Sequence, residues 1–522
     1  MDRTRRVRAD VRGLQALPEP QEPGSRQHSS RFCRCTGHAA AGAMDSYPKL
    51  LHSHRIHFPN NEASLVFPAA AFLRSPGTRP PFYLPEGSTG PSHAIPVCSH
   101  RTFSYLCATM IPYTRKTLPN GLTVVVNRDR ASKLAAVNIL YRVGARNENP
   151  ARTGFAHLFE HLMFGGSVNI PDYDMPLQLA GGENNAWTNN DITNYYLTVP
   201  RQNVETGFWL ESDRMLSLDF SERSLEVQRG VVMEEFKQRC LNQPYGDVGH
   251  LLRPLAYQTH PYQWPTIGKE LSHIANATLE EVKAFFFRFY APNNAILAVT
   301  GNISFEEAVA LTEKWFASIP RREVPLRNLP QEQEQTEERR LTVERNVPLD
   351  ALFMAYHMPD HRHPDYYAFD ILSDVLSNGR SSRLNQRLVQ QKQLFSSIDA
   401  YISGSVDAGL FHISGKPSAG VTLEQAEAAV REELELLQHE LVDEQELEKV
   451  KNKFESTQIF GNINYLNVAT NLAWFELLGR AEDMEKEVER YRSVTAEQLR
   501  TVAQSAFRKE NGVVLYYKKQ QN

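Results

Sequence analysis

From residue 110 onward, the apolar positions of the chain fall into helix-like and strand-like segments that follow one another without strict alternation. Residues Thr153–Phe164 contain no proline and are rich in apolar residues and good helix formers, so they predict a helix. A second helix is predicted at Leu225–Arg239, and apolar runs at Asn294–Val299 and Asp350–Tyr356 predict strands. This mixture favours an α+β fold over a doubly wound parallel sheet.

Two stretches of the chain repeat the same order of elements at an offset of 217 residues (278 to 495 and 294 to 511). Thr278–Glu281 and Thr495–Gln498 both look like capping boxes that open helices of similar length. Each helix is followed, after the same interval, by a turn and an apolar strand. The equal spacing predicts two structurally similar halves, each with layers of helices and strands.

A polar, charged and proline-containing segment separates these halves and predicts a linker at 321–339. The first half then covers 110–320 and the second 340–522. Apolar spacing in the second half predicts further elements: a helix near Tyr366–Leu376, strands near Phe395–Ile402 and Gly409–Ser414, and amphipathic helices at about 422–439 and 443–459.

Residues 1–109 have a different character, because they are rich in Pro, Ser, His and Arg and lack amphipathic periodicity. They predict a disordered leader. At Met110 the pattern changes abruptly, and we interpret Met110 as the true start and the leader as the product of a misassigned start codon. Several arginines near the N-terminus would also fit a mitochondrial transit peptide, but four acidic residues among the first 22 argue against it.

Composition narrows the class of protein. A hydrophobic fraction of 41% and a charged fraction of 23% are ordinary for a globular enzyme. The net charge of −4 gives no reason to expect a nucleic acid or an anionic membrane as partner. No apolar run approaches the length of a membrane-spanning helix. Without a visible targeting signal, the cytoplasm is the default location, and the mitochondrion and the periplasm stay open as alternatives.

His157, Glu160 and His161 give the sequence its clearest chemistry. Residues four apart lie on one face of a helix, so the two histidines can offer their nitrogens to one zinc ion. Glu160 lies on the same face and can take a proton from a water molecule at the metal. This H-x-x-E-H order inverts the H-E-x-x-H motif of other zinc peptidases. The competing interpretation is an amphipathic helix with two unrelated histidines.

The run Val231-Val-Met-Glu-Glu235, about 75 residues further on, completes a resemblance to a known family. With the motif at 157–161, it makes the chain similar to the pitrilysin/insulinase zinc peptidases, the inverzincins, and to their short, processing-peptidase-like bacterial members. The resemblance implies one Zn²⁺ per chain, held by His157, His161 and Glu235, with Glu160 as general base. Glu234 points about 100° away around the helix and cannot take the place of Glu235 without a register change.

A second family feature is the segment Gly181–Tyr196, which resembles the glycine turn and the N-A-x-T-x-x-D-x-T strand beside the zinc of these enzymes. In the family this edge strand pairs with the extended backbone of the substrate, because an open edge carries unpaired N–H and C=O groups. The resemblance therefore implies that Asn185, Ala186 and Trp187 contact substrate. The alternative is a polar strand with nothing bound to it.

The second half contains no H-x-x-E-H and resembles the inactive half of the family. Active members take an arginine and a tyrosine from a further inactive half, but the corresponding strands here contain Tyr401 and no arginine between Ser396 and Ile413. The resemblance therefore implies a two-chain chamber, either a homodimer or a heterodimer with an inactive homologous subunit. His361 and its neighbouring histidines and aspartates we interpret as a solvated loop rather than a second metal site.

Taken with the resemblance, these residues predict a zinc-dependent endopeptidase that hydrolyses peptides or unfolded segments inside such a chamber. The alternative is a non-catalytic peptide-binding or assembly subunit. The intact set of His157, Glu160, His161 and Glu235 argues against this alternative, because relatives of that kind usually lose at least one of the four.

Overall fold

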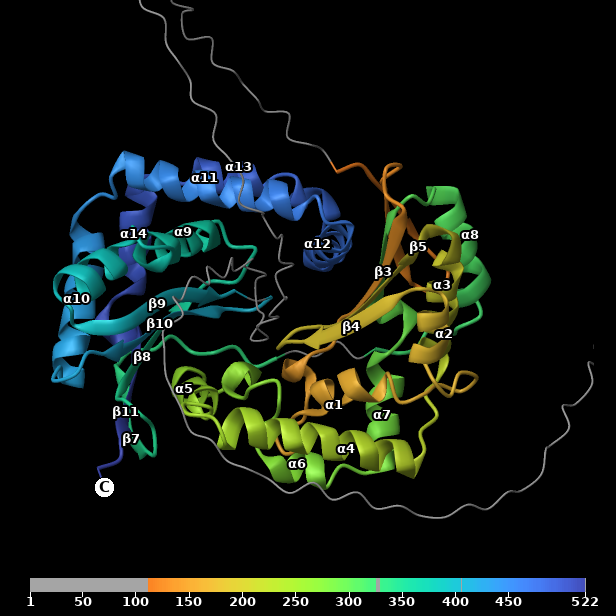
Figure 1. Cartoon of the computed structure of the whole chain (residues 1–522), viewed down its shortest axis with the longest axis horizontal. Coiled ribbons are helices and arrows are strands. Elements are labelled where there is room, and N and C mark those ends of the chain that lie inside the picture. Colours follow the sequence, from red (N-terminus) through yellow and green to blue (C-terminus); the bar gives the residue numbers. More distant parts are fainter. Residues whose placement is uncertain (1–110, 325–328, 405, 522) are drawn as a thin grey trace, which may run out of the picture. The chain divides into compact units, whose positions relative to one another are not determined.

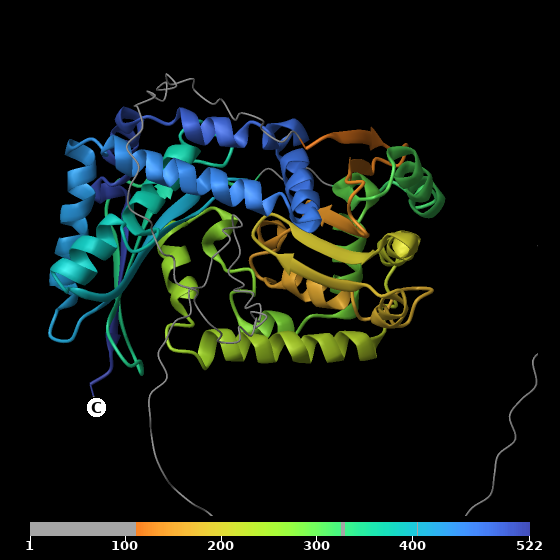
Figure 2. The same cartoon turned by 45° about the horizontal axis from the view of Figure 1, so that its top comes forward.

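The computed structural model describes residues 111–324, 329–404 and 406–521. It contains two β-sheets with helices packed on them, so the predicted α+β class and the two sheet-bearing halves are confirmed (Figures 1 and 2). The predicted leader at 1–109 and the proposed start at Met110 lie outside the described residues.

The first half is built on a six-stranded sheet in the order β1-β2-β6-β3-β5-β4. Neighbouring strands are antiparallel except β2 and β6, which run parallel. β4 is therefore an edge strand. The strands are β1 (Tyr113–Thr117), β2 (Thr123–Arg128), β3 (Leu134–Tyr141), β4 (Glu183–Thr188), β5 (Thr193–Pro200) and β6 (Ala295–Gly301). The helices are α1 (Phe155–Leu162), α2 (Asp174–Leu179), α3 (Val204–Leu216), α4 (Glu222–Phe236), α5 (Val248–Ala256), α6 (Leu271–Ala275), α7 (Leu279–Phe289) and α8 (Phe305–Phe316).

The second half has a five-stranded sheet in the order β7-β11-β8-β10-β9. This order matches β2-β6-β3-β5-β4 of the first sheet strand for strand, with β9 at the edge in place of β4. The strands are β7 (Arg339–Arg345), β8 (Ala351–Met358), β9 (Phe395–Ser403), β10 (Gly409–Pro417) and β11 (Gly512–Lys519). The helices are α9 (Tyr366–Ser377), α10 (Leu423–His439), α11 (Glu444–Gly461), α12 (Tyr465–Leu478), α13 (Glu487–Ser493) and α14 (Ala496–Ala506).

The predicted repeat extends to individual side chains. The Nδ2 group of Asn294 donates to the carbonyl of the last residue of α7 at 2.8 Å, and that of Asn511 donates to the last residue of α14 at the same distance. The capping boxes agree only in part. Thr278 and Glu281 form both hydrogen bonds of the box, whereas the Gln498 side chain donates to Asp365 at 3.0 Å and leaves the box at Thr495 half formed.

Each half also sends a helix across the sheet of the other half. α12 packs on β3 and β6 of the first sheet, and α5 packs on β8 and β11 of the second (Figure 1). The two helices begin at residues 248 and 465, which are again 217 apart. Apolar residues on both sides of these contacts form two continuous clusters, one around α12 and one around α5. α12 therefore covers the face of the first sheet that the helices of the first half leave open, and α5 covers the corresponding face of the second sheet.

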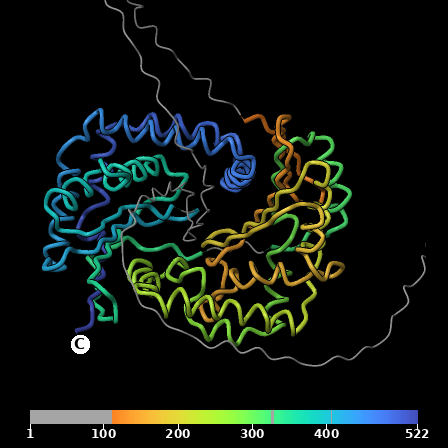
Figure 3. The backbone as a smooth tube through the Cα atoms, in the orientation of Figure 1, coloured from red at the N-terminus to blue at the C-terminus, as the bar shows by residue number. Residues whose placement is uncertain are grey.

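Between α8 and β7, the described residues contain no helix or strand, and Figure 3 shows the backbone of the two halves on either side. Residues 329–338 are tied to the first half, because the Glu332 carboxylate accepts the backbone N–H groups of Gln258, Thr259 and His260, each at 2.9 Å. The domain limits at 320 and 340 stay a prediction. Within the three described ranges, no helix is both long and apolar enough to cross a membrane.

Candidate metal centre

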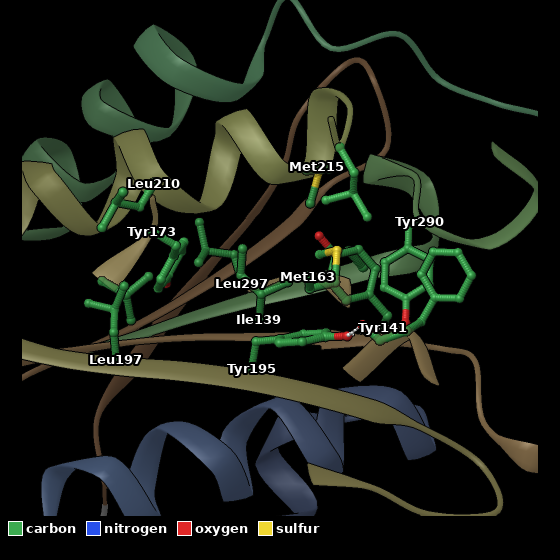
Figure 4. Close-up of a cluster of buried hydrophobic side chains, with 14 of the residues drawn as sticks. Ile139, Tyr141, Met163, Tyr173, Tyr195, Leu197, Leu210, Met215, Tyr290 and Leu297 are labelled. Carbon is green, nitrogen blue, oxygen red and sulfur yellow. Dashed lines mark hydrogen bonds between the residues drawn. The ribbon is translucent and has the colours of Figure 1, made fainter. Parts of the chain in front are cut away.

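Helix α1 presents its polar residues on one side because its other side is anchored in the core. Phe155, Leu158, Phe159 and Leu162 are buried in the main cluster of the first half. The same buried cluster contains Tyr141 of β3, Tyr195 of β5 and Tyr290, which follows α7 (Figure 4), and the Tyr195 hydroxyl donates to the Phe159 carbonyl at 3.1 Å. The opposite side of α1 carries the three residues of the H-x-x-E-H motif.

The start of α1 is fixed by a residue that the sequence analysis did not single out. Glu148 is 1% exposed, and its two carboxylate oxygens accept the backbone N–H groups of Gly154 and Ala156 at 2.8 Å each. Gly154 has φ +88°, a conformation that favours glycine. A carboxylate at a helix N-terminus satisfies free N–H groups and interacts favourably with the helix dipole. The sequence did contain a signal for this contact, because Glu148 is an acidic residue that precedes the predicted helix.

Helix α4 brings Glu235 to the two histidines. The Oε2 atom of Glu235 lies 3.4 Å from His157 Nε2 and 3.3 Å from His161 Nε2. The possible metal-ligand atoms of the three residues all lie within 4.8 Å of one another. Glu234 points away and pairs with Lys237 at 2.5 Å. The structure therefore brings together the three predicted ligands and excludes Glu234, as helical geometry predicted.

The charges at this cluster suit a divalent cation. Burial lowers the pKa of His157 to about 4, so its imidazole is neutral near pH 7. Burial acts against ionisation of Glu235, but the hydrogen bond to His161 and the charges of His157 and Arg239 lower its pKa to about 2. The Nη2 atom of Arg239 lies 2.9 Å from Glu235 Oε1 and contributes to this lowering of the pKa. Two imidazole nitrogens and one carboxylate form a donor set that fits Zn²⁺ with one position left open.

Glu160 lies beside the cluster without belonging to it. Burial raises the pKa of its carboxyl group, although a hydrogen bond to Thr188 acts in the opposite direction. Thr188 is the last residue of β4, so the edge strand holds the predicted base. A raised pKa brings a carboxylate closer to the range in which it can both accept and return a proton.

The predicted substrate residues lie on β4, and the structure places them on an edge as expected. Asn185 is exposed, and its side-chain oxygen accepts the backbone N–H of Ala186 at 2.8 Å. Trp187 is half-buried against the cluster around α12. Asn185 therefore faces accessible space, whereas Ala186 is half-buried against the main cluster of the first half and Trp187 packs between the halves.

The turns at the ends of the two edge hairpins are joined by a buried ion network that the sequence analysis missed. Arg146 Nη1 lies 3.0 Å from Asp191 Oδ1, in the turn between β4 and β5. The same nitrogen lies 2.8 Å from Asp407 Oδ2, in the turn between β9 and β10. Tyr262 donates to Asp191 at 2.6 Å, and the Val406 N–H donates to the same carboxylate at 3.1 Å. No local signal could reveal this contact, because Asp191 and Asp407 are 216 residues apart (191 to 407).

The predicted loop between β8 and α9 is confirmed, but His361 within it is not solvated. His361 is 4% exposed, and its ring packs on Tyr366 and Trp474 with centroid distances of 4.2 and 6.0 Å. It is not a metal ligand either: across the described ranges, the single group of three or more His, Cys, Asp or Glu residues with metal-binding spacing is His157, His161 and Glu235. Tyr401 lies partly exposed on the edge strand β9 and stacks on His412 at 4.8 Å.

Comparison with known proteins gives two family matches. Residues 123–269 match the family described as insulinase (peptidase family M16), and residues 276–454 match the peptidase M16 inactive domain. The zinc protease PqqE of Helicobacter pylori is 32% identical over 341 residues, which cover 64% of this chain and 77% of that protein.

Solved structures agree with these matches. The crystal structure of a protease from Helicobacter pylori has a TM-score of 0.75 and 28% identity, and the match covers 78% of this chain and 99% of that one. Pitrilysin has the same fold with a TM-score of 0.62 at 17% identity, and here the match covers 78% of this chain but only 45% of the pitrilysin chain.

Proposed function

The chain belongs to peptidase family M16, and from this premise we propose that it is a zinc-dependent endopeptidase with its active site in the first half. The observation that carries the proposal is the convergence of His157, His161 and Glu235 on one point with the buried carboxyl of Glu160 beside it. A helix with two unrelated histidines would not bring a third ligand from another helix into this position.

The residues of this chain would divide the reaction between them. His157, His161 and Glu235 would hold the zinc ion, which when bound supplies a Lewis acid for the scissile carbonyl and lowers the pKa of water. Glu160 accepts a proton from the attacking water and passes it to the nitrogen of the leaving amine. Its hydrogen bond to Thr188 couples the base to β4. The open edge of β4 pairs with the extended backbone of the substrate near Asn185 and Ala186.

We further propose that the working enzyme contains two chains. The described second half supplies Tyr401 on its edge strand, and its β9–β10 hairpin contains no arginine. This chain also matches less than half of the pitrilysin chain. A homodimer, or a heterodimer with an inactive homologous subunit, would supply the missing half and enclose peptides or unfolded segments as substrates. The cytoplasm stays the predicted location.

The test is hydrolysis of a quenched fluorescent peptide mixture by the zinc-loaded protein. Glu160→Gln should keep its zinc and lose turnover by roughly 10²–10⁴-fold, the usual contribution of a general base. Glu226→Gln is the matched control, because it makes the same change on an exposed residue of α4 that lies away from the three ligands, and it should cleave normally. Equal cleavage by wild type and Glu160→Gln would contradict the proposal. Bound zinc and bound peptide with no cleavage, even after a partner subunit is added, would favour the peptide-binding or assembly function.

A further inference from the structure

A groove of about 520 Å³ runs along the side of α4 next to the metal centre. Glu235 forms part of its wall, so the groove begins at the proposed zinc ligand. The other lining residues come from α4 and the turn that follows it: Val227, Gly230, Val231, Glu234 and Gln238. Val231 lies one helical turn before Glu235 and Val227 two turns before, so both point to the same side of the helix.

The residues of this groove are poor choices for the exposed side of a helix. Val227 and Val231 are 54% and 46% exposed, and β-branched residues favour helices less than unbranched ones. Glycine inside a helix is less stable than alanine at the same place. Their opposite side, with Leu225, Val232 and Phe236, is buried as expected. The exposed side thus gives up helix stability without gaining contacts inside this chain.

Gly230 makes this point most sharply. A methyl group added there would meet nothing within 4 Å, so packing within the described chain does not require glycine. Its backbone does not require glycine either, because it is not among the residues with positive φ. What glycine leaves is open space in the wall of the groove. A residue that costs local stability and keeps a groove open beside a proposed catalytic metal points to a ligand group that fits there.

We propose that this groove is a subsite for an apolar side chain of the peptide substrate and that Gly230 sets the size of the side chain it accepts. The proposal rests on the peptidase function proposed above. Glu235 is shared between the proposed metal centre and the groove, so a side chain in the groove would lie close to the metal. The two valines would contact the apolar side chain.

The test maps the cleavage sites of the zinc-loaded, full-length protein in a peptide mixture by mass spectrometry and compares wild type with Gly230→Leu. Leucine places an apolar side chain in the groove beside Val227 and Val231, so kcat/KM for peptides with a large apolar residue at this subsite should fall about tenfold relative to those with alanine there. Gly230→Ala should unfold at the same or a higher temperature than wild type and still shift the preference towards smaller residues. Gly461→Ala is the control, because Gly461 is equally open, ends a helix of the second half and does not line the groove.

Each outcome decides the proposal. An unchanged cleavage profile in Gly230→Leu, with wild-type activity present, overturns the subsite and leaves the peptidase function standing. A changed oligomeric state in sedimentation, together with an unchanged profile, assigns the groove to a second copy of this chain and also overturns the subsite. If wild type and Glu160→Gln give the same cleavage products, or none, the peptidase function is contradicted. The subsite, which rests on that function, is then contradicted as well.

Discussion

The two halves share a skeleton and differ in the helix that follows their central strand. β3 leads into α1 in the first half, and β8 leads into α9 in the second, with the same sheet order around both. α1 presents two histidines four residues apart to a glutamate of α4. α9 carries Asp370 and Asp374 at the same spacing, but no group with metal-binding geometry lies there among the described residues. The fold alone therefore does not make the site.

The second half uses this position for a polar network inside its core. Tyr491 donates to Asp370 Oδ2 at 2.5 Å, and Asn378 donates to Asp374 Oδ1 at 2.7 Å. Burial and the neighbouring Asp370 raise the pKa of Asp374 to about 7 and that of Glu487 to about 8. A protonated carboxyl group is a poor metal ligand. The difference between the halves is therefore one of charge as well as residue type: Glu235 is ionised at neutral pH, whereas Asp374 and Glu487 keep their protons up to a much higher pH than Glu235 does.

The largest expected effect comes from removing one ligand of the first half. His161→Ala should lower the zinc content from one ion per chain to near zero and abolish peptide hydrolysis, because two ligands do not hold zinc as three do. The matched change in the second half, His361→Ala, should keep its zinc. Metal analysis of the dialysed proteins checks both, and stoichiometric zinc in His161→Ala would count against this ligand set.

The tie between the two hairpin turns offers the next test. Arg146→Gln removes the cation that lies between Asp191 and Asp407 and should lower the free energy of unfolding by about 3 kcal/mol, because a buried carboxylate is left unpaired. The exposed pair of Arg480 and Glu482 is the control, and Arg480→Gln should change the free energy by less than about 0.5 kcal/mol. Urea unfolding measures both. If Arg146→Gln and Arg480→Gln lower the free energy of unfolding by similarly small amounts, the ion pairs between the two hairpin turns do not stabilise the fold.

The two halves should also differ in their response to pH. The pKa of Glu487 is raised by burial and by Asp370, against the opposing charge of Arg490. A raised pKa stabilises the fold while the group is protonated, and this stability is lost as the pH rises towards about 8. At about 1.4 kcal/mol per pKa unit, the loss between pH 5.5 and 8 should be roughly 1–3 kcal/mol. Glu487→Gln should remove this pH-dependent loss of stability. If the free energy of unfolding falls equally with pH in wild type and in Glu487→Gln, the prediction is contradicted.

The smallest predicted effect should be the same in both halves. Thr278 and Thr495 each accept one backbone N–H at the start of equivalent helices, from Glu281 at 3.2 Å and Gln498 at 3.1 Å. Thr278→Ala and Thr495→Ala should each lower the free energy of unfolding by about 1 kcal/mol. Thermal unfolding of the two variants checks this, and a loss at one site alone would show that the repeat is not equivalent in energy.

Features that depend on neighbours in sequence were predictable. The helix around the H-x-x-E-H motif follows from its local composition, and the choice of Glu235 over Glu234 follows from helical geometry and the family resemblance. The 217-residue repeat was visible because its capping and strand signals are local. Zinc occupancy and substrate contact at Asn185, Ala186 and Trp187 stay predictions.

Features that depend on distant residues were not predictable. His361 lies in a loop, as its flanking prolines predicted, but it is buried because Trp474 of α12 covers it from more than 100 positions away along the chain (361 to 474). Gln498 has the right residue type for a capping box, yet Asp365 takes its side chain. In each case a tertiary partner outweighed a local preference, which is why these residues could not be placed from their immediate neighbours.

The most direct test of the central claim is anomalous diffraction at the zinc absorption edge from crystals of the zinc-loaded protein. The account predicts one peak per chain, between the Nε2 atoms of His157 and His161 and the carboxylate of Glu235, and none beside Asp370 and Asp374 of the second half. A peak in the second half, or no peak between the three predicted ligands, would contradict it.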